Sequence, residues 1–174
     1  MPHRLPAALA LSVALVLSGC SDDPEPKVAP EPSALNSPAT ASPSGHASGL
    51  GPEGVVRAWV EARNEALEEG NTTAVRKLSS PSCKTCEDLL RPIKTVHAEG
   101  GEFDTPGWRV AGTNIKREGR GQIEIDTALI YASGSTTPSA GAEPVRYGEE
   151  KHIAVFRLVR ADEIWLVDFI GYLS

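Results

Sequence analysis

Ten consecutive residues alternate strictly between the two faces of an extended chain: QIEIDTALIY, residues 122–131. One face carries Ile123, Ile125, Thr127, Leu129 and Tyr131, and the other carries Gln122, Glu124 and Asp126. A period of two residues is that of a β-strand with one buried face. An antiparallel sheet with one apolar face needs a cover, so the rest of the chain must supply it.

The N-terminal side of this strand predicts helices. After Gly54, apolar residues recur at helical spacing and form a stripe that also includes an arginine: Val56, Trp59, Val60, Arg63 and Leu67. Gly70 ends this helix, and a short second helix contains Val75 and Leu78. Ser82 is expected to cap a third helix, whose stripe is Cys86, Leu89, Leu90, Ile93 and Val96.

Three more strands are expected around the alternating one. Residues 108–115 form a less regular strand in which Gly112 marks a bulge. Ala154, Phe156 and Leu158 form one face of a later strand, and Trp165, Val167 and Phe169 form one face of the last, after a turn near Ala161 and Asp162. Residues 133–144 are rich in Gly, Ser and Thr and predict an exposed loop. The predicted fold class is α+β, with three N-terminal helices packed on a four-stranded, curved antiparallel sheet.

The first nineteen residues have the form of an export signal. His3 and Arg4 precede an apolar run from Leu5 to Leu17, which is shorter than the roughly 20 residues of a membrane-spanning helix. The segment ends Leu17-Ser18-Gly19-Cys20, which resembles the bacterial lipobox, and this resemblance implies a lipid on the Cys20 sulfur. The alternative is an ordinary signal peptide. Acylation would hold the protein on the extracytoplasmic face of the cell membrane.

Residues 20–53 are expected to form the lipidated cysteine and a disordered stalk. From Ser21 to Glu53 there is no Trp, Tyr, Phe, Ile or Met, and seven of the 14 prolines lie there. Such a segment buries too little apolar surface to offset its ordering entropy. It is a spacer or a Ser/Thr-rich glycosylation target. Residues 54–174 are then one domain, large enough for a single core.

Composition excludes two classes of partner. The net charge of −6 provides no basic field that could hold nucleic acid. Three cysteines are too few for a four-cysteine zinc site. We therefore expect no nucleic acid, metal or cofactor.

Cys83 and Cys86 form a C-x-x-C pair at a predicted helix N-terminus. A helix dipole there would stabilise a thiolate, which makes a redox role physically reasonable. Redox motifs of the thioredoxin type, however, follow a strand, whereas this pair follows a helix and a turn. Since an exported location favours stable disulfides, we expect a structural bond, with redox chemistry as the alternative.

The order of three helices and a curved sheet resembles the cystatin-like cone of the nuclear-transport-factor-2 (NTF2) and ketosteroid-isomerase superfamily. Three features together also resemble an uncharacterised family of actinobacterial exported lipoproteins: the lipobox with its stalk, the stretch LSSPSCKTC at residues 78–86, and Gly100-Gly101. That family has no established activity, so the resemblance implies location and fold but no reaction.

No residue pattern assigns a catalytic centre. Asp126 and Asp168 fall on the polar faces of their strands, and no Asp–His pair is set by local spacing. His97 and His152 are expected to be solvated or hydrogen-bonded rather than catalytic. We expect a non-catalytic module that binds an envelope protein or a small apolar ligand. The alternatives are an isomerase or dehydratase that uses the cone pocket, and a thiol-disulfide protein.

Overall fold

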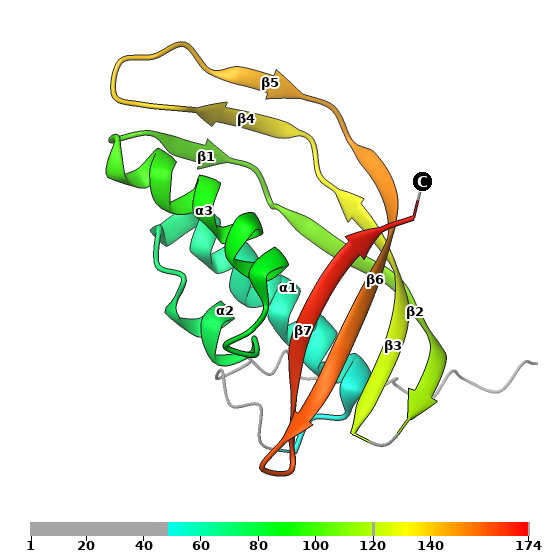
Figure 1. Cartoon of the computed structure of the whole chain (residues 1–174). Coiled ribbons are helices and arrows are strands. Elements are labelled where there is room, and N and C mark those ends of the chain that lie inside the picture. The colour runs from blue at the N-terminus through cyan, green and yellow to red at the C-terminus, as the bar shows by residue number, and fades with distance from the viewer. Residues whose placement is uncertain (1–48, 120, 174) are drawn as a thin grey trace, which may run out of the picture. The chain divides into compact units, whose positions relative to one another are not determined.

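The computed structural model describes residues 49–119 and 121–173. Three helices, α1 (Pro52–Glu69), α2 (Thr73–Lys77) and α3 (Lys84–Ala98), lie against one face of a curved antiparallel sheet (Figure 1). The helices precede every strand in the chain, as their sequence patterns predicted. The predicted fold class is therefore confirmed. Residues 1–48, with the expected signal segment and most of the stalk, lie outside the described residues. Pro52 and Glu53 were expected in the stalk, but they form the start of α1, where a proline is favoured at the first helical position.

The main sheet has four antiparallel strands in the order β2-β3-β6-β7. Their bounds are β2 (Trp108–Gly119), β3 (Gln122–Tyr131), β6 (Glu150–Ala161) and β7 (Ile164–Tyr172). A register shift in β2 between Val110 and Gly112 confirms the predicted bulge. Asp162 and Glu163 have positive φ angles of 46° and 68° and form the turn expected near Asp162.

Three short strands form a second sheet that the sequence analysis missed. They are β1 (Glu102–Asp104), β4 (Gly134–Thr137) and β5 (Val145–Tyr147), in the order β1-β4-β5. The prediction of an exposed loop over residues 133–144 is wrong for β4, which pairs with both of its neighbours. Its Gly-Ser-Thr-Thr sequence has no large apolar side chain, and its place in the sheet rests on backbone pairing.

The second sheet continues the first. β1 precedes β2, β4 follows β3 and β5 precedes β6, so the order β1-β4-β5 repeats the order β2-β3-β6 (Figure 1). The three long strands are thus each interrupted once, at residues 105–107, 132–133 and 148–149. These three breaks lie next to one another across the strands.

Trp59 of α1 occupies the centre of the core. Its side chain has 0% exposure, and its ring contacts that of Phe156 edge to face, with 5.9 Å between centroids. Four of the five residues predicted on the inward face of β3 are buried (Ile123, Ile125, Thr127 and Leu129). The fifth, Tyr131, is partly buried and packs against the core, so the alternation of that strand is confirmed. The indole Nε1 of Trp59 donates a hydrogen bond to Ser79 Oγ at 2.9 Å, which satisfies its one polar atom.

Two details of the N-terminal half and the last strand differ from expectation. Ser82 does not cap α3, because Cys83 is the N-cap residue and its sulfur accepts a hydrogen bond from Cys86 N. In β7 the register shifts so that Val167 pairs with Leu158 and Phe169 pairs with Arg157. Asp168 is the extra residue of this bulge. Phe169 therefore leaves the face of Val167, and Ile170 takes the buried position instead.

The first strand break depends on a glycine. Gly107 has a φ of 81°, and a Cβ atom there would lie 2.2 Å from Asn64 Oδ1. The side chain of Asn64 in α1 binds the backbone of Trp108, the residue after Gly107. Its Nδ2 donates to Trp108 O at 2.7 Å, and its Oδ1 accepts from Trp108 N at 2.9 Å. A side chain at residue 107 would displace this amide from the strand.

Gly107→Ala is expected to lower the free energy of unfolding by about 2 kcal/mol or more, because it adds a strained positive φ and disturbs the Asn64 hydrogen bonds. Gly112→Ala is the matched control, since a Cβ atom at Gly112 meets nothing within 4 Å. It should change stability by no more than about 0.5 kcal/mol. Urea unfolding followed by far-UV circular dichroism measures both, and equal midpoints for the two variants would contradict the assignment.

Candidate functional site

A pocket with a volume of about 300 Å³ opens where the strands break. All three breaks contribute to its lining: Thr105 and Gly107 from the first, Ala132 from the second and Gly148 from the third. α1 supplies Arg63 and Leu67 to the same lining. The volume is at the lower end of the range of small-molecule sites in proteins.

Aromatic rings form most of the remaining wall. They are Phe103, Trp108, Tyr131 and Tyr147. Trp108 and Tyr131 are cross-strand partners, and their rings stack with 4.5 Å between centroids and 4° between planes. Flat, stacked rings present an apolar surface that suits a planar or aliphatic ligand body.

Arg63 stacks on the same tryptophan. Its guanidinium carbon lies 3.6 Å from the centroid of the Trp108 ring. Tyr131 lies too close to that ring for both groups to share one face, so Trp108 is sandwiched between Arg63 and Tyr131. Two guanidinium nitrogens, Nε and Nη1, are buried and have no hydrogen-bond partner among the described residues. Burial lowers the pKa of Arg63 from its ordinary value to about 10, so the group stays charged at neutral pH.

Further polar groups surround Tyr131. Its hydroxyl donates to the hydroxyl of Tyr172 at 2.7 Å, and the ring of His152 lies 4.5 Å from its own. Burial, with help from the Tyr172 hydrogen bond, raises the pKa of Tyr131 above its ordinary value, so the phenol is neutral. Glu150, which lines the pocket, is 65% exposed and its Oε2 lies 2.9 Å from His152 Nε2.

The other residues considered from the sequence lie outside this pocket. Asp126 is on the outer face of β3 and forms an ion pair with Lys116 at 3.5 Å. His97 Nε2 lies 2.8 Å from Leu67 O, which gives it a structural role between α3 and α1.

Arg63 was grouped with the apolar stripe of the first helix and not recognised as a site residue. The signal was present, because a cation in an apolar stripe is directed to the interior.

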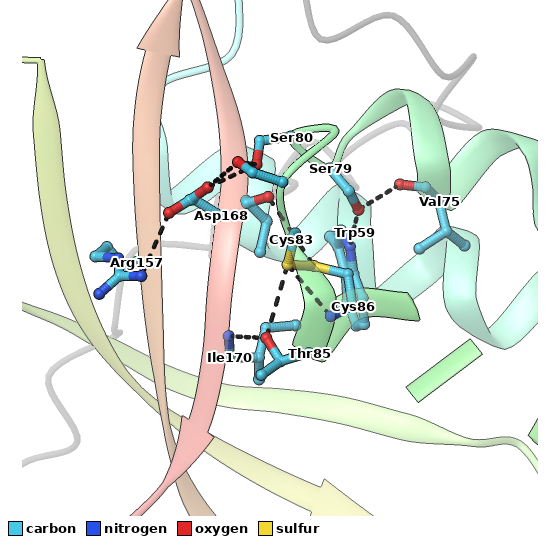
Figure 2. The surroundings of a disulfide bond; sticks show 12 residues. Trp59, Val75, Ser79, Ser80, Cys83, Thr85, Cys86, Arg157, Asp168 and Ile170 are labelled. Carbon is cyan, nitrogen blue, oxygen red and sulfur yellow. Dashed lines mark hydrogen bonds and ion pairs between the residues drawn. A yellow bond between two sulfur atoms is a disulfide. The ribbon is translucent and has the colours of Figure 1, made fainter. Parts of the chain in front are cut away.

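The C-x-x-C pair lies in a second region, at the start of α3 (Figure 2). The structure joins Cys83 and Cys86 by a disulfide bond, and the two residues are only 2% and 1% exposed. The preceding loop is bonded to β7: Ser80 N donates to Val167 O at 2.7 Å, and Val167 N donates to Leu78 O at 2.9 Å. The loop before the pair is thus fixed to β7, and Cys86 Sγ lies 4.0 Å from Val167 O.

Asp168 completes this attachment. Its Oδ1 accepts hydrogen bonds from the hydroxyls of Ser80 at 2.6 Å and Ser82 at 2.9 Å, and Arg157 donates to Oδ2 at 3.3 Å (Figure 2). The bond from Ser80 is the main reason that the pKa of Asp168 is lowered, with Ser82 and Arg157 adding to it against a smaller opposing effect of burial. The ionised carboxylate of Asp168 therefore links the loop to the sheet. Asp168 does not line the pocket.

Two negative findings apply to residues 49–119 and 121–173. No group of three or more His, Cys, Asp or Glu side chains lies close enough together to hold a metal ion. No helix in this range is long and apolar enough to cross a membrane.

Comparison with known proteins adds a likeness of fold alone. No family model matches the sequence, and no curated protein matches it. Solved structures do. The intermembrane-space region of the chloroplast protein ARC6 is 9% identical with a TM-score of 0.49, over 70% of this chain and 93% of that one. An uncharacterised Caulobacter vibrioides protein with a cystatin-like fold is 9% identical with a TM-score of 0.45, over 69% of this chain and 88% of that one. A Nostoc punctiforme protein of unknown function with a cystatin-like fold is 8% identical with a TM-score of 0.41, over 71% and 92%.

Replacing both Cys83 and Cys86 by Ser is expected to lower the free energy of unfolding by about 1–3 kcal/mol, because the short covalent ring no longer restrains the unfolded chain. Guanidinium unfolding of the oxidised protein measures the change. Wild-type protein treated with a strong reductant is the control and should match the variant.

A redox pair would give a different result. Complete reduction in a mild glutathione buffer, together with faster disulfide exchange in a test substrate, would contradict a structural role.

Proposed function

We propose that the chain is a lipid-anchored protein of the cell envelope whose folded domain binds a small ligand without transforming it. The observation that supports this most directly is the pocket at the strand breaks, which has aromatic walls and a charged arginine. Such a combination of apolar surface and one polar group is typical of ligand sites.

The titratable groups of the lining favour binding over proton-transfer chemistry. They are Arg63, Tyr131, Tyr147 and Glu150. Arg63 stays protonated and Tyr131 stays neutral near pH 7, so neither exchanges a proton readily there. Glu150 is largely exposed and lies against His152. An isomerase or dehydratase needs a base directed at the bound substrate, and neither Arg63 nor Tyr131 can serve as one near pH 7.

The thiol-disulfide alternative has less support. An exchange catalyst presents at least one accessible sulfur to its substrate, whereas Cys83 and Cys86 are both buried. Because both residues are buried, a local opening of the structure would have to expose a sulfur atom before it could exchange with a substrate.

The anchor rests on sequence alone. Leu17-Ser18-Gly19-Cys20 after a short apolar run supports acylation at Cys20, and the Pro-rich sequence between Cys20 and α1 supports a stalk. We propose that the domain is held by this stalk on the outer face of the membrane, as the resemblance to actinobacterial exported lipoproteins implies. An envelope partner protein remains compatible with the same arrangement.

The pocket is tested with 2-naphthamide, an uncharged aromatic probe, by isothermal titration calorimetry on the purified soluble chain. We expect saturable binding with one site. Gly148→Phe should weaken it, because Gly148 lines the pocket and a Cβ atom there meets nothing within 4 Å, so a phenyl ring can be added at the pocket wall without a clash at its Cβ atom. Ala111→Phe, at an exposed position in β2 outside the pocket lining, is the control and should leave binding unchanged. Equal affinities for the two variants would contradict a site at this pocket.

The anchor is tested with Cys20→Ser in an expressing bacterial cell. The variant should remain unprocessed by the lipoprotein peptidase and should not incorporate a clickable palmitate analogue, because it lacks the acceptor sulfur. Wild-type chain is the positive control in the membrane fraction. Normal labelling of Cys20→Ser would refute the anchor and leave the pocket proposal unaffected.

A further inference from the structure

We propose that the ligand of this pocket carries a single carboxylate, and that the guanidinium of Arg63 is the group that binds it. The inference rests on the proposed binding function and names the chemical class of the ligand.

Arg63 has no counterion among residues 49–119 and 121–173. Each ion pair found among residues 49–119 and 121–173 joins other side chains, and Nε and Nη1 of Arg63 make no hydrogen bond there. A charge removed from water without a partner is unfavourable for folding. A charge that is buried and unpaired in the wall of a pocket is explained by a ligand that supplies the missing partner.

The stack of Arg63 on Trp108 determines how the guanidinium N–H donors are oriented. Trp108 supports the flat face of the guanidinium at 3.6 Å, which compensates part of its lost hydration and fixes its plane. Stacking uses the face of the group and leaves the N–H donors at its edge unpaired. A carboxylate is the anion that accepts strong, charge-assisted hydrogen bonds from such a group.

The charges in the pocket lining limit the number of negative charges on the ligand. Glu150 lines the same pocket and would repel an anion. Its side chain is largely exposed and lies beside His152, so solvent and the imidazole weaken this repulsion. A monoanion therefore fits the pair of Arg63 and Glu150, whereas each additional negative charge would meet Glu150 without a second cation in the lining.

The remaining wall selects the body of the ligand. Thr105 Oγ1 accepts from Gly107 N at 3.1 Å and donates to Ser133 O at 3.3 Å, so this hydroxyl is already used by the protein. Leu67 and Phe103 contribute apolar side chains to the lining. The class that fits is a small carboxylic acid with an aromatic or aliphatic body.

The test compares two probes of equal shape, 2-naphthoate and 2-naphthamide, by isothermal titration calorimetry at pH 7. We expect the wild-type chain to bind the naphthoate at least about tenfold more tightly, the factor that hydrogen bonds to a charged group provide. Arg63→Met should reduce this ratio to about twofold or less. Arg91→Met, which removes an exposed charge on α3 outside the pocket lining, is the control and should keep the wild-type ratio.

A thermal melt of the same proteins separates binding from structure. Arg63→Met should melt at the same temperature as wild type or higher, because it replaces an unpaired charge by a flexible apolar chain. A clear fall in melting temperature, with an unchanged probe ratio, would assign Arg63 a structural role and overturn the inference. Should the methionine variant fail to fold, Arg63→Lys decides: it keeps the charge and should retain a preference above twofold, and equal binding of the two probes would refute the proposal.

The two proposals fail in distinguishable ways. Equal affinity of wild-type protein for both probes would overturn the carboxylate inference and leave the binding pocket in place. Failure of wild-type protein to bind either probe would overturn both.

Discussion

The pocket depends on the two hydrogen bonds between the Asn64 side chain and the backbone of Trp108. One amide satisfies both the N–H and the C=O of the residue that starts β2, so the strand is fixed to α1 at the point where the sheet is interrupted. Gly107 permits this approach because it has no Cβ atom. The position of the Trp108 ring follows, and with it the stack that contains Arg63 and Tyr131.

A second attachment holds the opposite edge of the sheet. The backbone of Val167 in β7 bonds to the loop at residues 78–80, Thr85 Oγ1 accepts from Ile170 N at 2.9 Å, and the Asp168 carboxylate receives the hydroxyls of that loop. The unpaired edge of β7 is thereby covered, which protects it from pairing with other chains. Since the helical layer is fixed at both β2 and β7, the walls of the pocket are preorganised, and less ordering entropy opposes binding.

The sequence predicted what depends on periodicity. The stripe of α1 and the alternation of β3 are both confirmed, because burial of a face leaves a direct pattern in the chain. The sequence did not predict the features that depend on backbone geometry. β4 has no apolar pattern, and the extra residue at Asp168 moves Phe169 off the buried face of β7. The bulge is stabilised by hydrogen bonds to the loop and to Thr85, which join residues more than 80 positions apart in the chain. A local sequence pattern cannot reveal contacts between residues so far apart.

Arg63 is the instructive case, because the pattern placed it correctly while its chemistry was overlooked. It stands at a core-facing position of the stripe, where an apolar residue would favour folding, and adjoining Asn64 fixes that turn of the helix against β2. Arg63 and Leu67 are four residues apart and therefore lie on one side of α1, and both line the pocket. One turn of a helix thus supplies the attachment that shapes the pocket and the charge that enters it. A residue that opposes folding locally, in a structure otherwise consistent with its sequence, is where function is to be sought.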